Sequence, residues 1–137
     1  MNLFIDIDGV LLGKKSSEQN KICLAGYAEE FLDFALQKFD CYWLTTHCKG
    51  DATNAVDYLS QYGNRGFITL AQQVKPTNFN TFKTEALFGD FYWVDDQPMA
   101  YEIQYLYERG WLKYWLEVNT RNNYNELNSI ITFLKDI

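Results

Sequence analysis

The feature that most constrains this chain is a set of short apolar runs with acidic or hydroxyl residues at their ends. Runs of four or five apolar residues closed by polar ones predict strands that are buried on both faces of a sheet. The polar residues then fall at the carboxyl ends of the strands. The runs and their polar residues are 3–7 with Asp6 and Asp8, 41–44 with Thr45 and Thr46, and 91–94 with Asp95 and Asp96.

The segments between these runs have the period of half-buried helices. From Tyr27 to Phe39, apolar residues recur every three or four positions, which predicts a helix. We expect further helices over 51–63, 99–109 and the C-terminal segment, where Asn123 and Glu126 suggest a capping box. Further strands are expected at 66–70 and 114–118, a loop at 72–81, and one or two helical turns at 82–87.

Strands that alternate with helices predict an α/β fold with right-handed crossovers. We therefore expect a Rossmann-like, doubly wound parallel sheet of about five strands with flanking helices. Residues 10–25 interrupt this pattern with Gly13, lysines and serines, which favours a small hairpin or flap with a mobile tip. Lys14 and Lys15 would lie at that tip.

Length and charge restrict the function. At 137 residues and 16.1 kDa, residues 1–137 suit one domain. A net charge of −6 opposes coating of an extended nucleic acid. Three cysteines without a CxxC pair, and no long apolar run or signal peptide, favour a cytoplasmic protein that does not span a membrane. The oligomeric state is left open.

The polar strand ends should meet, because ligands bind beyond the carboxyl ends of strands in such sheets. Clustered carboxylates need compensating charge, and oxygen ligands favour Mg²⁺. Each residue type then has a chemical task in phosphoryl transfer. Asp6 can attack phosphorus, Asp8 can act as general acid and base, Thr45 and Lys83 can contact phosphoryl oxygens, and Asp95 and Asp96 can hold the metal.

These residues resemble the four ordered motifs of the haloacid dehalogenase superfamily. The motifs are Asp6-Ile7-Asp8-Gly9-Val10-Leu11, Trp43-Leu44-Thr45-Thr46, Lys83 and Trp93-Val94-Asp95-Asp96. The chain is particularly similar to short capless members, such as phosphatase-like domains associated with bacterial RNA-repair proteins. The segments between 12 and 27 and between 46 and 82 are too short for a folded cap, so the site should be open.

The resemblance implies a phosphomonoester hydrolase. It makes Asp6 the nucleophile and a Mg²⁺ ligand, Asp8 the general acid and base and a carbonyl ligand, and Asp95 a direct metal ligand. Asp96 would bind the metal or orient a water. Thr45 and Lys83 would contact the phosphate.

Several alternatives stay open at this stage. Thr46 could replace Thr45, and Lys75 before Pro76 competes with Lys83. His47 is interpreted as a polar residue beyond a strand rather than as a ligand. The phosphorylated substrate could be a small molecule or a macromolecular phosphate end. Two other functions compete: a signalling domain that accepts a phosphoryl group, and a catalytically idle domain that binds phosphate or metal.

Overall fold

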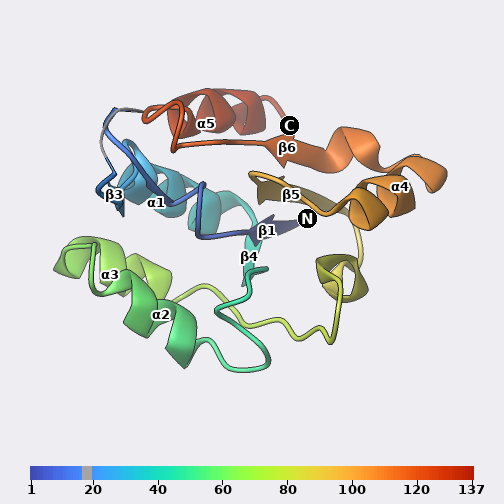
Figure 1. Cartoon of the computed structure of the whole chain (residues 1–137), viewed down its shortest axis with the longest axis horizontal. Helices are drawn as coiled ribbons and strands as arrows, with labels where there is room; N and C mark the ends of the chain where they lie inside the picture. Colours follow the sequence, from blue (N-terminus) through green and yellow to red (C-terminus); the bar gives the residue numbers. More distant parts are fainter. Residues whose placement is uncertain (17–19) are drawn as a thin grey trace.

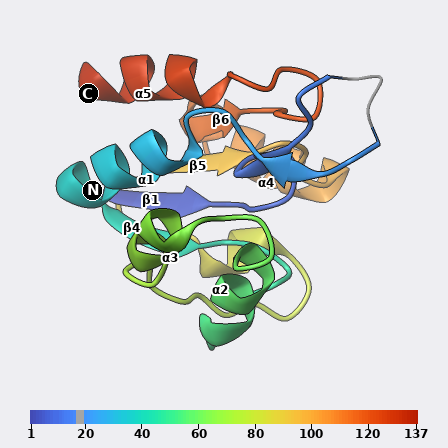
Figure 2. The same ribbon diagram turned by 90° about the vertical axis from the view of Figure 1, so that its left-hand side faces the viewer.

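A parallel sheet forms the centre of the molecule in the computed structural model, which describes residues 1–16 and 20–137. Within these residues the sheet has four strands in the order β4-β1-β5-β6, and each neighbouring pair is parallel. Figures 1 and 2 show the strands side by side in this order. The strands are β1 (Asn2–Ile5), β4 (Asp40–Trp43), β5 (Phe91–Asp95) and β6 (Trp115–Glu117).

Helices cover both faces of the sheet, as the doubly wound prediction requires. In Figure 1, α1 and α4 lie on opposite sides of the strands. The helices are α1 (Ala28–Lys38), α2 (Thr53–Leu59), α3 (Arg65–Ala71), α4 (Ala100–Glu108) and α5 (Leu127–Lys135), with 3₁₀ turns η1 (Lys83–Ala86) and η2 (Leu112–Tyr114). The predicted α/β class with a parallel sheet is confirmed.

The alternation of side chains along β1 separates two hydrophobic cores in the described part of the chain. Leu3 and Ile5 point into a core that is completed by α1, α3 and α5. Phe4 points into the other core, where Trp93 of β5 and Leu106 of α4 are also fully buried. Successive residues of a strand face opposite sides, so β1 is held by burial on both faces.

Segment 66–70, which was predicted to be a strand, is instead part of helix α3. Asn64 caps this helix, because its side-chain oxygen accepts a hydrogen bond from the amide of Phe67 at 2.9 Å. Phe67 and Ala71 are both fully buried and stand four residues apart, which is the helical rather than the strand spacing. The prediction of a strand here was wrong, and the described sheet has four strands instead of five.

The expected capping box at the start of α5 is also absent from the described contacts. The carboxylate of Glu126 accepts a hydrogen bond from the backbone amide of Asn119, at 2.6 Å. That amide lies beyond the end of β6, so Glu126 fixes the loop after the strand rather than the helix terminus. A tertiary contact has taken the place of a local one.

The predicted hairpin is present as strands β2 (Leu12–Gly13) and β3 (Cys23–Leu24), which pair antiparallel. Residues 17–19 of its tip lie outside the described residues, so the expectation of a mobile tip stays a prediction. In the described residues, no helix combines the length and apolar character needed to cross a membrane.

Candidate active site

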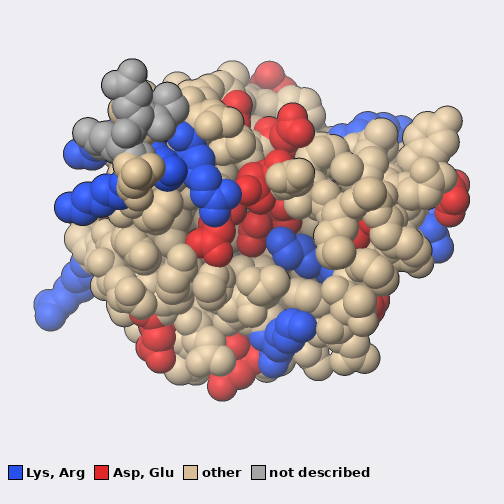
Figure 3. Space-filling view, in the orientation of Figure 1, with Lys and Arg blue, Asp and Glu red and all other residues tan. Residues whose placement is uncertain are grey.

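Three carboxylates meet at the carboxyl edge of the sheet. Asp6 follows β1, Asp95 ends β5, and Asp96 comes next in the chain. One carboxylate oxygen from each lies within 4.8 Å of the others. Asp6 and Asp95 are buried. Figure 3 shows acidic side chains gathered in the middle of this face, with basic side chains beside them.

Lys83 supplies positive charge to two of these carboxylates. Its Nζ lies 2.7 Å from Oδ2 of Asp95 and 3.3 Å from Oδ2 of Asp6. The lysine opens η1, the helical turn predicted at 82–87. Lys75 lies elsewhere, since its Nζ is 3.6 Å from Asp40 at the start of β4. Of the two candidate lysines, the structure brings Lys83 to the carboxylates.

Burial, together with repulsion from an acidic neighbour, raises the pKa of Asp6 and of Asp95 and makes both hard to ionise. Burial, with the neighbouring Asp95 as the next cause, raises the pKa of Asp6 to about 8 although Lys83 opposes the shift. Burial likewise raises the pKa of Asp95. Burial acts to lower the pKa of Lys83, but the Asp6 and Asp95 carboxylates outweigh it and raise that pKa. The lysine alone therefore does not balance the negative charge.

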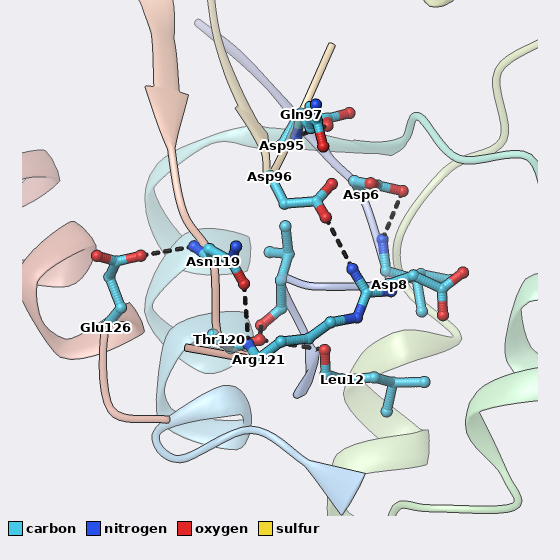
Figure 4. Close-up of polar contacts among 12 residues, drawn as sticks. Asp6, Asp8, Leu12, Asp95, Asp96, Gln97, Asn119, Thr120, Arg121 and Glu126 are labelled. Atoms are coloured by element: carbon cyan, nitrogen blue, oxygen red, sulfur yellow. Dashed lines mark hydrogen bonds and ion pairs between the residues drawn. The ribbon is translucent and has the colours of Figure 1, made fainter. Parts of the chain in front are cut away.

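Asp96 is paired with a cation that sequence reasoning missed. Its Oδ2 accepts a hydrogen bond from Nη1 of Arg121 at 2.9 Å (Figure 4). Gly9 lies against this pair. Its φ of +76° is in the left-handed region that favours glycine, and a Cβ at this position would lie 2.4 Å from Oδ2 of Asp96. Arg121 follows β6, so the rule that polar residues after a strand meet at the site could have identified it.

The loop that carries Arg121 is fastened to the loop that follows Asp8. The buried Thr120 donates from its Oγ1 to the carbonyls of Val10 and Leu12, at 3.0 and 3.1 Å. Its amide donates to the carbonyl of Gly9 at 2.9 Å. Figure 4 shows Thr120 and Arg121 below the acidic cluster. The loop after β6 thus supports the turn between Asp8 and the hairpin.

Asp8 turns to a different set of partners from Asp6. Its Oδ2 lies 2.8 Å from Nε2 of His47, and its Oδ1 accepts a hydrogen bond from the Tyr58 hydroxyl at 2.7 Å. Burial and then this hydrogen bond raise the pKa of Tyr58. His47 therefore contacts a predicted catalytic residue, although the sequence was interpreted otherwise. Tyr58 was missed, because only the packing of α2 shows where its hydroxyl reaches.

The two candidate threonines have different surroundings. Thr45 is buried, and its Oγ1 accepts a hydrogen bond from the amide of His47 at 3.3 Å. Thr46 lines a cavity of about 210 Å³ together with Lys83. The other lining residues are Phe79, Thr81, Gln97, Met99 and Glu102. Thr45 thus contacts the loop that carries His47, and Thr46 borders the same cavity as Lys83.

The cluster is chemically suited to a metal ion. Asp6, Asp95 and Asp96 offer convergent carboxylate oxygens, the donors that hard divalent cations prefer. Burial raises the pKa of Asp6 and of Asp95, and added positive charge would favour their ionised forms. The residues present therefore fit a divalent cation.

Comparisons of the chain with models of protein families, with curated proteins and with solved structures found no match.

Proposed function

We propose that this protein is a Mg²⁺-dependent phosphohydrolase of the haloacid dehalogenase type, which cleaves a phosphomonoester through an aspartyl-phosphate on Asp6. One observation carries the proposal. Asp6 lies within a carboxylate cluster beside Lys83, while Asp8, two residues later, has its own partners. Two carboxyl groups in contrasting environments suit a nucleophile and a separate acid and base.

The first step forms the covalent intermediate. A carboxylate oxygen of Asp6 attacks phosphorus, and the bond from phosphorus to the leaving oxygen breaks as Asp8 donates a proton to that oxygen. Lys83, together with the hydroxyl of Thr45 or Thr46, stabilises the transferring phosphoryl oxygens. A magnesium ion held by Asp6, Asp95 and Asp96 would supply the remaining positive charge and favour the ionised form of Asp6.

The second step regenerates the enzyme. Asp8, now ionised, takes a proton from a water molecule as that water attacks phosphorus. The bond between phosphorus and Asp6 breaks, which releases inorganic phosphate and restores the carboxylate. Asp8 is then protonated again and ready for the next substrate.

The size of the cavity beside Lys83 bears on the class of substrate. The cavity of about 210 Å³ beside Thr46 and Lys83 is small for a whole ligand, since typical ligand pockets measure roughly 300 to 1,000 Å³. The site would then hold the phosphate and the adjoining atoms, while the rest of the substrate stays outside. This suits a small metabolite and equally the terminal phosphate of a larger molecule.

The decisive experiment measures phosphate release by the purified protein from a panel of phosphomonoesters, with Mg²⁺ and with a chelator. We expect turnover that requires Mg²⁺ and falls at least ~100-fold in Asp6→Asn, because nucleophile and metal ligand are lost together. Asp90→Asn is the matched control. It removes one exposed carboxylate just before β5, at the amino ends of the strands and away from the acidic cluster.

Three outcomes would contradict the proposal. Full turnover by Asp6→Asn would show that Asp6 is not the nucleophile. Turnover that is unchanged by chelator would show that the reaction needs no metal ion. Uptake of one phosphoryl group per chain without turnover would favour the phosphoryl-accepting alternative.

Calorimetric titration with Mg²⁺ alone tests the metal site independently of activity. Asp95→Asn should weaken the binding of Mg²⁺, and Asp90→Asn should leave it unchanged.

A further inference from the structure

The carboxyl group of Asp8 is held at both oxygens. His47 Nε2 lies 2.8 Å from Oδ2, and the Tyr58 hydroxyl lies 2.7 Å from Oδ1. The three residues come from the loop after β1, the loop after β4 and helix α2. With both oxygens engaged, rotation of the carboxyl group breaks at least one of these contacts.

The two partners are themselves fixed. The rings of His47 and Tyr58 stack, with centroids 3.9 Å apart and planes at 16°. The amide of His47 donates to Oγ1 of Thr45 at 3.3 Å. Tyr58 is carried by a short helix that is anchored through buried Ala55 and Leu59. The pair is therefore a preformed support rather than two free side chains.

The support still leaves Asp8 able to react. Its side chain is 36% exposed, against 8% for Asp6, so a substrate can reach it. A carboxyl group has about four lone-pair positions, and one contact at each oxygen leaves a second position on each, which can carry the proton for the leaving oxygen. An exposed carboxyl without such contacts would spread over several side-chain rotamers.

We propose that His47 and Tyr58 are positioning residues that fix the Asp8 carboxyl in the orientation for proton donation to the leaving group. This inference rests on the proposed phosphohydrolase function and extends it to two residues outside the predicted motifs. The pair acts through Asp8. Removing either contact should therefore impair the step that needs the proton and spare binding of the phosphate.

Proton donation matters most when the leaving oxygen is basic. A 4-nitrophenolate departs readily without a proton, whereas unsubstituted or methoxy-substituted phenolate needs more assistance. Substituted phenyl phosphates vary this basicity at nearly constant shape. The ratio kcat/KM covers the steps up to release of the leaving group, so hydrolysis of the aspartyl-phosphate does not enter it.

The experiment measures kcat/KM for 4-nitrophenyl, unsubstituted phenyl and 4-methoxyphenyl phosphate. In Tyr58→Phe, which keeps the ring and loses the hydroxyl, we expect a loss of roughly 10- to 100-fold for the two poorer leaving groups and within about 3-fold for the nitrophenyl ester. His47→Phe, which keeps a stacking ring, should behave alike. His47→Gln, which restores a nitrogen donor, should recover most of the loss.

Tyr92→Phe is the matched control, because Tyr92 packs against Tyr114 and Phe133 away from the acidic edge. Its profile should equal that of the parent protein. An equal loss on all three esters in Tyr58→Phe and His47→Phe, or no loss on any, would overturn the positioning role. If the parent protein shows no Asp6-dependent turnover, the proposed function itself fails, and the inference fails with it.

Discussion

At the scale of single residues, the two carboxylates of Asp6 and Asp8 differ in their burial and in their hydrogen-bond partners. Asp6 is buried against Asp95 and Lys83, and Asp8 is partly exposed between His47 and Tyr58. Ile7 between them is fully buried, and its carbonyl accepts hydrogen bonds from the amides of Val10 and Leu11 in the turn that follows. Two like residues thereby acquire separate environments within three positions of sequence.

The raised pKa of Asp6 predicts how the metal-free protein responds to pH. Because the native pKa lies above the unfolded value of 3.8, at about 8, the native state binds more protons in the interval between them. The free energy of unfolding should therefore fall as pH rises from about 4 to about 8. In chelator at pH 8, Asp6→Asn should be more stable than the parent by more than about 1 kcal/mol, since one pKa unit is worth roughly 1.4 kcal/mol.

Urea unfolding at pH 4, 6 and 8 in chelator measures this difference. The gap between the two proteins should narrow toward the acid end, because at pH 4 Asp6 is protonated in the native state and close to half protonated in the unfolded state, whose pKa is 3.8. Asp33→Asn, on the exposed side of α1, serves as the control and should show no comparable trend. A gap that widened toward pH 4 would contradict the assigned direction of the pKa shift.

Much of the site could be predicted from sequence because its residues follow strands. Asp6, Asp95 and Asp96 obey the rule that carboxyl ends of parallel strands share an edge, and the structure brings them together. Tyr58 lies within a helix, and its reach to Asp8 depends on how α2 packs. Arg121 also follows a strand, but its place beside Asp96 depends on the hydrogen bonds by which Thr120 holds this loop against the turn after Asp8. These contacts are tertiary and leave no local pattern.

At the scale of elements, the same limit explains the error at α3. The residues of 66–70 have a run of apolar character typical of a strand, but the helix begins one residue after a capping Asn64. α3 then packs against α1. Capping and packing on a neighbouring helix outweighed the β propensity of Phe67 and Ile68, which is a weak preference in any context.

The cap can be tested directly. Asn64→Ala removes the acceptor for the amide of Phe67 and should lower the free energy of unfolding by about 1 kcal/mol. Asn54→Ala, at an exposed position inside α2, is the matched substitution and should change stability by less than about 0.5 kcal/mol. Chemical denaturation of the three proteins gives the comparison. Equal effects of the two substitutions would show that capping does not hold α3.

At the scale of the whole molecule, one sheet joins two cores. β1 contributes Leu3 and Ile5 to one side and Phe4 to the other. Neither face can lose its packing without disturbing β1, the strand that leads directly into Asp6. The described part of the chain should therefore unfold as one cooperative unit, as small single domains usually do.

Substitutions in each core test this cooperativity. Leu32 of α1 and Leu106 of α4 are both fully buried, on opposite faces. Leu32→Ala and Leu106→Ala should each lower the free energy of unfolding by roughly 2 to 5 kcal/mol. In each variant, tryptophan fluorescence and far-ultraviolet circular dichroism should report the same midpoint. Two separate transitions in either variant would show that the faces unfold independently.

The pairing of β1 with β5 also bears on how the chain matures during synthesis. Asn2 pairs with Phe91, and ribosomes add roughly 5 to 20 residues each second. Asp6 thus leaves the ribosome seconds before Asp95 and Asp96, and before Arg121, which pairs with Asp96. A nascent chain holds Asp6 apart from its partners throughout this interval. The three carboxylates can therefore meet only after residue 96 has left the ribosome, so the repulsion between Asp6 and its acidic neighbours arises late in synthesis.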